Sequence, residues 1–107
     1  MKVLFVCSRN RLRSPTAEAV FSGYPGLEVS SAGTSVDADN RVSLDQVEWA
    51  DIIFAMEEIH RRRLKEMFPD VLKEKKVVVL RIPDKYSYMD PELIKTLKQK
   101  VSRLIRT

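Results

Sequence analysis

The sequence predicts an α/β fold in which a parallel sheet carries helices on both faces. Short apolar runs of strand length alternate with longer segments whose apolar residues recur at helical spacing. Such alternation is typical of βαβ units, whose strands lie parallel. A length of 107 residues suits one domain, and 44% hydrophobic residues are ordinary for a globular protein. We therefore expect residues 1–107 to form a single domain.

The first half of the chain supplies two predicted strands and the helix between them. Residues 2–6 are almost wholly apolar and are expected to form a central strand. Ser14 and Pro15 have the residue types of an N-cap and a first helical position, which predicts a helix that starts here. A turn rich in Gly and Pro then leads to a second strand at 27–31, which Gly33 is expected to end.

The same alternation continues to the end of the chain. The expected elements are a polar loop at 34–42, a short helix that starts with a capping box of Ser43 and Gln46, a strand at 51–56, a helix at 57–68, a strand at 77–82, and a helix from 92 to about 106. Trp49 is expected to pack in the core, or alternatively to line a substrate cleft. His60 stands in a basic run that predicts an exposed helix face, so we expect no catalytic role for it.

The loop after the first strand has the residues for phosphoryl transfer. Cys7 is the only cysteine, and five residues separate it from Arg13. The amides of a loop between a strand and a helix can form an anion-binding nest, and the helix N-terminus adds partial positive charge. Arg13 can bind two oxygens of a tetrahedral oxyanion, and Ser14 can donate to the nucleophilic thiolate. The alternative is that Cys7 is an unreactive buried residue.

Residues 7–15 resemble the phosphate-binding loop of the low-molecular-weight protein tyrosine phosphatases, whose pattern is Cys-x5-Arg-Ser/Thr near the N-terminus. Residues 31–34, residues 50–57 and an acidic segment after the last strand also match in order. The resemblance covers nearly the whole chain and is closest to a compact bacterial-type branch. It implies an open four-stranded parallel sheet of order 2-1-3-4. It also implies a cysteine-dependent protein tyrosine phosphatase that needs neither a metal ion nor another cofactor.

The resemblance also implies roles for individual residues. Cys7 is expected to be the nucleophile, and Arg13 to hold the phosphoryl group. A carboxylic acid must protonate the leaving oxygen, and relatives carry it directly after the last strand, which favours Asp84. Asp90 is the alternative, although it can equally cap the last helix. The expected substrate-binding residues are Ser8, Arg9, Asn10, Arg11, Leu12, Ser14, Tyr86 and Tyr88.

Several positions depart from the pattern of the relatives, which commonly read Cys-x-Gly-Asn-x-Cys-Arg-Ser. Arg9 replaces the glycine, and Leu12 replaces a second cysteine that would form a protective disulfide. Arg9 and Arg11 add positive charge at the mouth of the site, which is expected to widen the choice of substrates to multiply charged phosphates. Tyr86 and Tyr88 are expected either to stack on an aromatic phosphoester or to lie on the surface.

Charge and cysteine usage indicate the partners and the compartment. The net charge of +4 and the pI near 9.4 suit a phosphotyrosine-containing protein or another phosphomonoester. Nucleic acid suits the same charge but is the less favoured partner, and the oligomeric state stays open. A lone thiol and no long apolar run predict a cytoplasmic protein without a membrane segment. The alternative function is a phosphate- or phosphoprotein-binding module of the same fold with little turnover.

Overall fold

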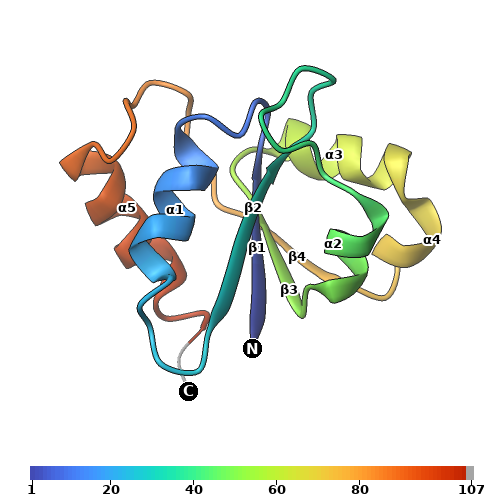
Figure 1. The fold of residues 1–107 in the computed structure, drawn as a ribbon, viewed down its shortest axis with the longest axis horizontal. Helices are drawn as coiled ribbons and strands as arrows, with labels where there is room; N and C mark the ends of the chain where they lie inside the picture. Colours follow the sequence, from blue (N-terminus) through green and yellow to red (C-terminus); the bar gives the residue numbers. More distant parts are fainter. Residues whose placement is uncertain (106–107) are drawn as a thin grey trace.

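A four-stranded parallel sheet forms the middle layer of the structure (Figure 1). The computed structural model describes residues 1–105, so the predicted end of the last helix near residue 106 lies outside the described residues. The strands are β1 (Lys2–Cys7), β2 (Glu28–Gly33), β3 (Ile52–Ala55) and β4 (Lys76–Val79). Their order is β2-β1-β3-β4, which confirms the predicted fold class and strand order.

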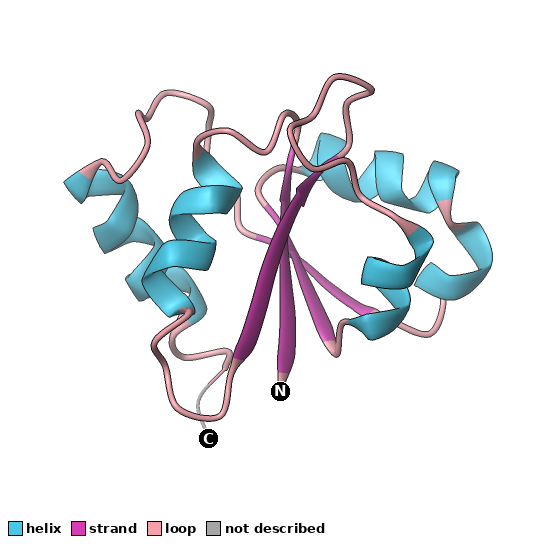
Figure 2. Cartoon of the chain, viewed as in Figure 1, coloured by secondary structure: helices cyan, strands magenta, loops and turns pink. Residues whose placement is uncertain are grey.

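Helices cover both faces of this sheet (Figure 2). On one face lie α1 (Arg13–Phe21) and α5 (Pro91–Val101), and on the other lie α2 (Leu44–Trp49), α3 (Glu58–Met67) and α4 (Pro69–Leu72). Among the helices of residues 1–105, none combines the length and the apolar character needed to cross a membrane.

The core consists of two apolar clusters, one on each side of the sheet. Successive residues of β1 alternate between them, so Phe5 belongs to one cluster and Leu4 to the other. The Phe5 ring stacks on Phe21 and Phe54, with ring centroids 5.7 and 5.4 Å away. Trp49 is half-buried against the cluster beneath α2, as expected for core packing. Burial of both faces explains why β1 reads as an apolar run.

Two boundaries near the phosphate-loop motif differ from the prediction. Helix α1 begins at Arg13, and its N-cap position is Leu12, which makes no side-chain cap. Ser14 is therefore not the N-cap, because its buried hydroxyl contacts Cys7 instead. Strand β2 does not stop before Gly33, which pairs with Cys7 as the last residue of the strand. A Cβ on Gly33 would lie 2.4 Å from the Ser8 carbonyl oxygen, so the missing side chain permits close approach.

Further along the chain, the predicted caps are confirmed and some lengths change. Ser43 and Gln46 form the capping box of α2, and the Asp90 side chain accepts from the Glu92 N–H at the start of α5. The predicted 57–68 helix ends at Met67, and a separate one-turn helix, α4, follows. Strand β4 ends at residue 79 rather than 82, and α5 ends at residue 101.

Candidate active site

The loop 8–12 lies at the carboxyl edge of the sheet, where open parallel sheets bind their ligands. Cys7 ends β1 and is 3% exposed. Its Sγ lies 2.9 Å from the Ser14 Oγ, and the Asn10 N–H donates to it at 3.3 Å. The relatives' glycine is replaced by Arg9, but the left-handed residue of this loop is Asn10, with φ of 58°. Asparagine tolerates that conformation, so the loop keeps its turn without the glycine.

The carbonyl groups of this loop are held on its outer side by the 34–41 segment. Backbone N–H groups of Thr34 and Ser35 donate to the carbonyls of Cys7 and Ser8, and the Asp39 N–H donates to that of Arg9, at 2.9–3.0 Å. In a trans peptide the carbonyl and the following N–H point in opposite directions. The N–H groups of residues 8–10 therefore point inward, and they form the nest that the sequence predicted.

A buried chain of hydrogen bonds orients the Ser14 hydroxyl towards the sulfur. The Asn10 amide donates to the Ser14 Oγ and to the Ser31 Oγ, both at 2.9 Å. Ser31 in turn donates to the Glu18 carboxylate. The Ser14 oxygen accepts from Asn10, so its single proton has two acceptors within reach, the Cys7 sulfur at 2.9 Å and the Ala32 carbonyl at 3.4 Å. The sulfur is the nearer of the two, and as a thiolate it is the stronger acceptor. The roles of Ser31 and Glu18 were not predicted from the sequence.

Arg13 is buried and clamped by two segments distant in sequence. Its side chain is 4% exposed, and its Nη1 donates to the Glu57 carboxylate and to the Ile82 carbonyl. Its Nε lies 3.7 Å from the Asp84 Oδ1. Among residues 1–105, no side chain or carbonyl accepts a hydrogen bond from its Nη2, so this nitrogen is available to a phosphate oxygen. Sequence reasoning did not identify Glu57, whose position directly after β3 was the available signal.

His60 is fully buried beneath the loop, so the predicted exposed position is wrong. Its Nδ1 accepts the Glu57 N–H at 3.0 Å, which leaves the Nε2 proton to be donated to the Ser8 Oγ at 2.9 Å. Burial and the nearby Arg13 guanidinium lower the pKa of His60 to about 4, so the ring is neutral near pH 7. The first turn of α3 lies against the loop and buries a polar residue there, which periodicity alone does not reveal.

A cavity of about 320 Å³ opens over Cys7. Its lining residues are Cys7, Ser8, Arg9, Arg11, Leu12, Arg13 and Asp84. Asp84, which the sequence analysis favoured as the general acid, thus lines the same cavity as the thiol, and its side chain is 62% exposed. Asp90 caps α5 and is not among the lining residues. In residues 1–105, no group of three or more His, Cys, Asp or Glu side chains is arranged to hold a metal ion.

The structure does not bring the two predicted tyrosines into this cavity. Tyr86 is partly buried against the core on the α1 and α5 side, and the Lys85 ammonium lies 5.4 Å from its ring centroid. Tyr88 is 54% exposed and lines a separate hollow beside α1. In this conformation neither ring is placed to stack on a group bound over Cys7.

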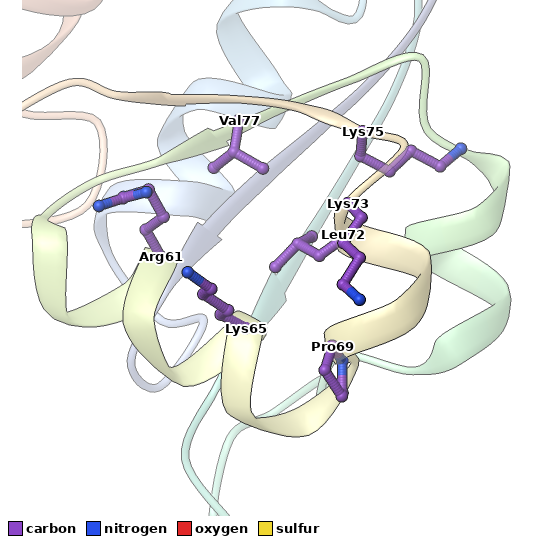
Figure 3. Close-up of a pocket in the computed structure, with 7 residues that line it drawn as sticks. All are labelled: Arg61, Lys65, Pro69, Leu72, Lys73, Lys75 and Val77. Carbon is purple, nitrogen blue, oxygen red and sulfur yellow. The ribbon is translucent and has the colours of Figure 1, made fainter.

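A second cavity, of about 330 Å³, lies between α3, α4 and β4 (Figure 3). Its lining residues are Arg61, Lys65, Pro69, Leu72, Lys73, Lys75 and Val77. The Lys75 ammonium donates to the carbonyls of Glu48 and Ala50 and is directed away from the apolar floor of Leu72 and Val77. The lining residues of this cavity include no thiol, hydroxyl or carboxylic acid, so the Cys7 cavity is the candidate active site.

A cysteine at the end of a strand, inward-pointing amides and a clamped arginine are the features that a phosphate-binding site with a cysteine nucleophile requires. Residues 2–48 match the model of the family described as low molecular weight phosphotyrosine protein phosphatase. The chain is 30% identical over 93 residues to a protein-arginine-phosphatase of Geobacillus stearothermophilus. That match spans 64% of this chain and 63% of the length of the curated relative.

Solved structures of phosphatases have the same fold as this chain. A protein tyrosine phosphatase of Entamoeba histolytica superposes with a TM-score of 0.80 and 26% identity, over 98% of this chain and 93% of that one. The YwlE arginine phosphatase of Geobacillus stearothermophilus has a TM-score of 0.78 and 24% identity, over 96% of this chain and 89% of that one. The tyrosine phosphatase Wzb of Escherichia coli shares the fold, with a TM-score of 0.78 and 20% identity over 96% of this chain and 94% of that one. The predicted resemblance to the low-molecular-weight phosphatase family, including bacterial members, is confirmed.

Proposed function

We propose that this protein hydrolyses phosphomonoesters on proteins, with phosphotyrosine as the first candidate substrate, through a cysteinyl-phosphate intermediate. The observation that carries the proposal is the nest itself: the Asn10 N–H donates to the Cys7 sulfur, and Arg13 lines the same cavity as Cys7. Such preorganised donors stabilise the charge that develops on transferred phosphoryl oxygens. The reduced thiol that the reaction needs fits the cytoplasmic location predicted from the sequence.

The proposed reaction has two steps. The Cys7 thiolate attacks phosphorus, the bond from phosphorus to the ester oxygen breaks, and Asp84 gives its proton to the leaving oxygen. The Asp84 carboxylate then takes a proton from water as that water attacks the cysteinyl-phosphate, which releases inorganic phosphate and regenerates the thiolate. Ser14 stabilises the sulfur anion at both stages, because its oxygen lies 2.9 Å from Sγ.

Phosphoarginine is a second candidate substrate, because the relative from Geobacillus stearothermophilus is described as an arginine phosphatase. The Cys7 chemistry would be the same, with a nitrogen rather than an oxygen as the leaving atom. Turnover of peptides that contain phosphotyrosine, compared with peptides that contain phosphoarginine, decides between the two substrates.

Hydrolysis of p-nitrophenyl phosphate and phenyl phosphate, with a chelator present, tests the mechanism. Cys7→Ser should abolish turnover. Asp84→Asn should lose about 10²- to 10⁴-fold on phenyl phosphate. It should lose less on p-nitrophenyl phosphate, whose leaving group scarcely needs protonation. Asp90→Asn is the matched control and should retain activity. A folded wild type that binds phosphate but turns over neither ester would support the binding-module alternative.

A further inference from the structure

Two arginines at the rim of the Cys7 cavity have no role in the proposed chemistry. Arg9 and Arg11 line the cavity on either side of the buried Asn10. The Arg9 Nε lies 3.6 Å from the Asp37 carboxylate, and the Arg11 Nε lies 3.2 Å from that of Asp39. Neither aspartate lines the cavity, so in each ion pair the arginine is the member next to the cavity.

These ion pairs differ from the Arg13 clamp in their exposure. The side chains of Arg9 and Asp37 are 62% and 61% exposed, and those of Arg11 and Asp39 are 47% and 59% exposed. Ion pairs in such exposed positions are weak and exchange readily with other anions. The side chain of Arg13 is 4% exposed and is held in place by Glu57 and a main-chain carbonyl. Its position is therefore fixed for binding the phosphoryl group.

The rest of the cavity wall offers little to an aromatic leaving group. Leu12 is the only large apolar side chain that lines it, and no aromatic residue of the described chain does so. Recognition of the group next to the phosphate must therefore rely on charge. Three arginines and a single carboxylate, Asp84, line the cavity, so its net charge is positive and favours an additional anion.

We propose that Arg9 and Arg11 form a second anion subsite, which selects phosphorylated peptides with acidic side chains beside the phosphorylated residue. The inference rests on the proposed function and names its preferred substrate class. In the free protein Asp37 and Asp39 form ion pairs with the two arginines. On binding, a substrate carboxylate joins these ion pairs or replaces the aspartates in them. Arg11 is expected to contribute more than Arg9, because it is the less exposed of the two.

The test compares two phosphotyrosine peptides that differ only in having Asp or Asn on both sides of the phosphotyrosine. At low ionic strength the wild type should show a kcat/KM about three- to tenfold higher for the acidic peptide. The ratio should fall towards one in 0.5 M KCl, because salt screens exposed charges. p-Nitrophenyl phosphate, which has no second anion, provides the baseline in every case.

Variants locate the effect. Arg11→Gln should lower the ratio of the two kcat/KM values more than Arg9→Gln does, with each peptide rate expressed relative to the same variant's hydrolysis of p-nitrophenyl phosphate. Arg62→Gln is the matched control, because it removes the same charge from an exposed position on α3 and should leave the ratio unchanged. Asp39→Asn should raise the kcat/KM ratio, since it removes the carboxylate that neutralises Arg11, while the Arg11 contact with the Asp37 carbonyl stays. A purely structural role of the pair would not produce effects of opposite sign.

Equal kcat/KM for the two peptides in the wild type overturns the inference, as does an Arg62→Gln effect as large as that of Arg11→Gln. A preference for a small diphosphorylated compound over both peptides would also overturn the peptide assignment. If the wild type turns over no phosphoester, the proposed function fails separately. Equilibrium binding of the two peptides to Cys7→Ser then still measures the subsite, with the acidic peptide expected to bind three- to tenfold more tightly.

Discussion

At the scale of the residue, the candidate site depends on buried and half-buried polar groups that are paired with one another. Arg13 donates to the Glu57 carboxylate, and the Glu57 N–H donates to the His60 Nδ1. His60 in turn donates to Ser8 in the phosphate loop. Removing one member of such a set leaves its partner buried without a hydrogen bond, which costs more than the bond itself contributes.

Glu57→Gln should weaken the interaction that holds Arg13 in place without removing it. The amide still accepts one hydrogen bond but no longer balances the buried guanidinium, so we expect a loss of about 1–3 kcal/mol in unfolding free energy. We also expect kcat/KM to fall about tenfold, since the arginine is less firmly placed. Glu58→Gln is the matched control, because Glu58 pairs with Arg61 on the surface. Urea unfolding and steady-state kinetics of both variants measure the difference, and equal effects would contradict the clamp.

His60 should make stability depend on pH. Its pKa of about 4 in the folded protein lies below the ordinary value of 6.5. Between these values the unfolded chain binds one more proton than the folded chain, so stability falls as pH falls from 6.5 to 4. The loss is at most about 3 kcal/mol. His60→Gln does not titrate, and its unfolding free energy should fall less than that of the wild type between pH 7 and 4.5. Parallel pH dependences would show that the buried imidazole is not responsible.

At the scale of the element, the end of β2 and the 34–41 segment shape the phosphate loop from outside. Gly33 pairs with Cys7, and the next residues donate their N–H groups to the carbonyls of the loop. The inward direction of the nest amides is thus imposed by a neighbouring strand and its loop. A segment that the sequence shows only as polar is therefore part of the support of the site.

Gly33→Ala tests this support. The added methyl would lie 2.4 Å from the Ser8 carbonyl oxygen and 2.7 Å from the Ala38 Cβ, so the loop must shift. We expect a destabilisation of about 1–3 kcal/mol and a large loss of turnover. Gly23→Ala is the matched control, since nothing lies within 4 Å of its Cβ and the substitution restricts the unfolded chain. Thermal unfolding and p-nitrophenyl phosphate hydrolysis distinguish them, and a fully active Gly33→Ala would contradict the role of the close approach.

At the scale of the whole molecule, one sheet separates two apolar clusters that carry different parts of the site. Cys7 belongs to the cluster beneath α1 and α5, while His60 and Glu57 come from the α3 side. The site can form only when both layers are in place. This arrangement predicts that the chain unfolds as the single domain that its length suggests.

Two spectroscopic probes test that prediction. Trp49 fluorescence reports on the layer beneath α2, and far-UV circular dichroism reports on the helices of both layers. The two urea transitions should have the same midpoint within error, because the layers share every strand of the sheet. Inorganic phosphate at 100 times its Kd should raise the unfolding free energy obtained from either probe by about 2.7 kcal/mol. Separated midpoints would show that the layers unfold independently.

The sequence by itself determined the fold class and the position of the cysteine proposed as the nucleophile. Alternating strand-length and helical segments predicted the α/β class, and the motif from Cys7 to Pro15 predicted the loop between β1 and α1. The capping box of Ser43 and the cap at Asp90 were also readable. These features depend on residues close together in the chain, where spacing and residue type carry the physical information.

The tertiary structure alone decided what surrounds the sulfur. Glu57 and Ile82 reach Arg13 from 44 and 69 residues away. His60 lies buried rather than on an exposed helix face, because the start of α3 lies against the loop. The two tyrosines lie outside the cavity although they follow Asp84 closely in the chain. Periodicity specifies which face of an element is apolar, but the packing of elements decides which polar groups are enclosed between them.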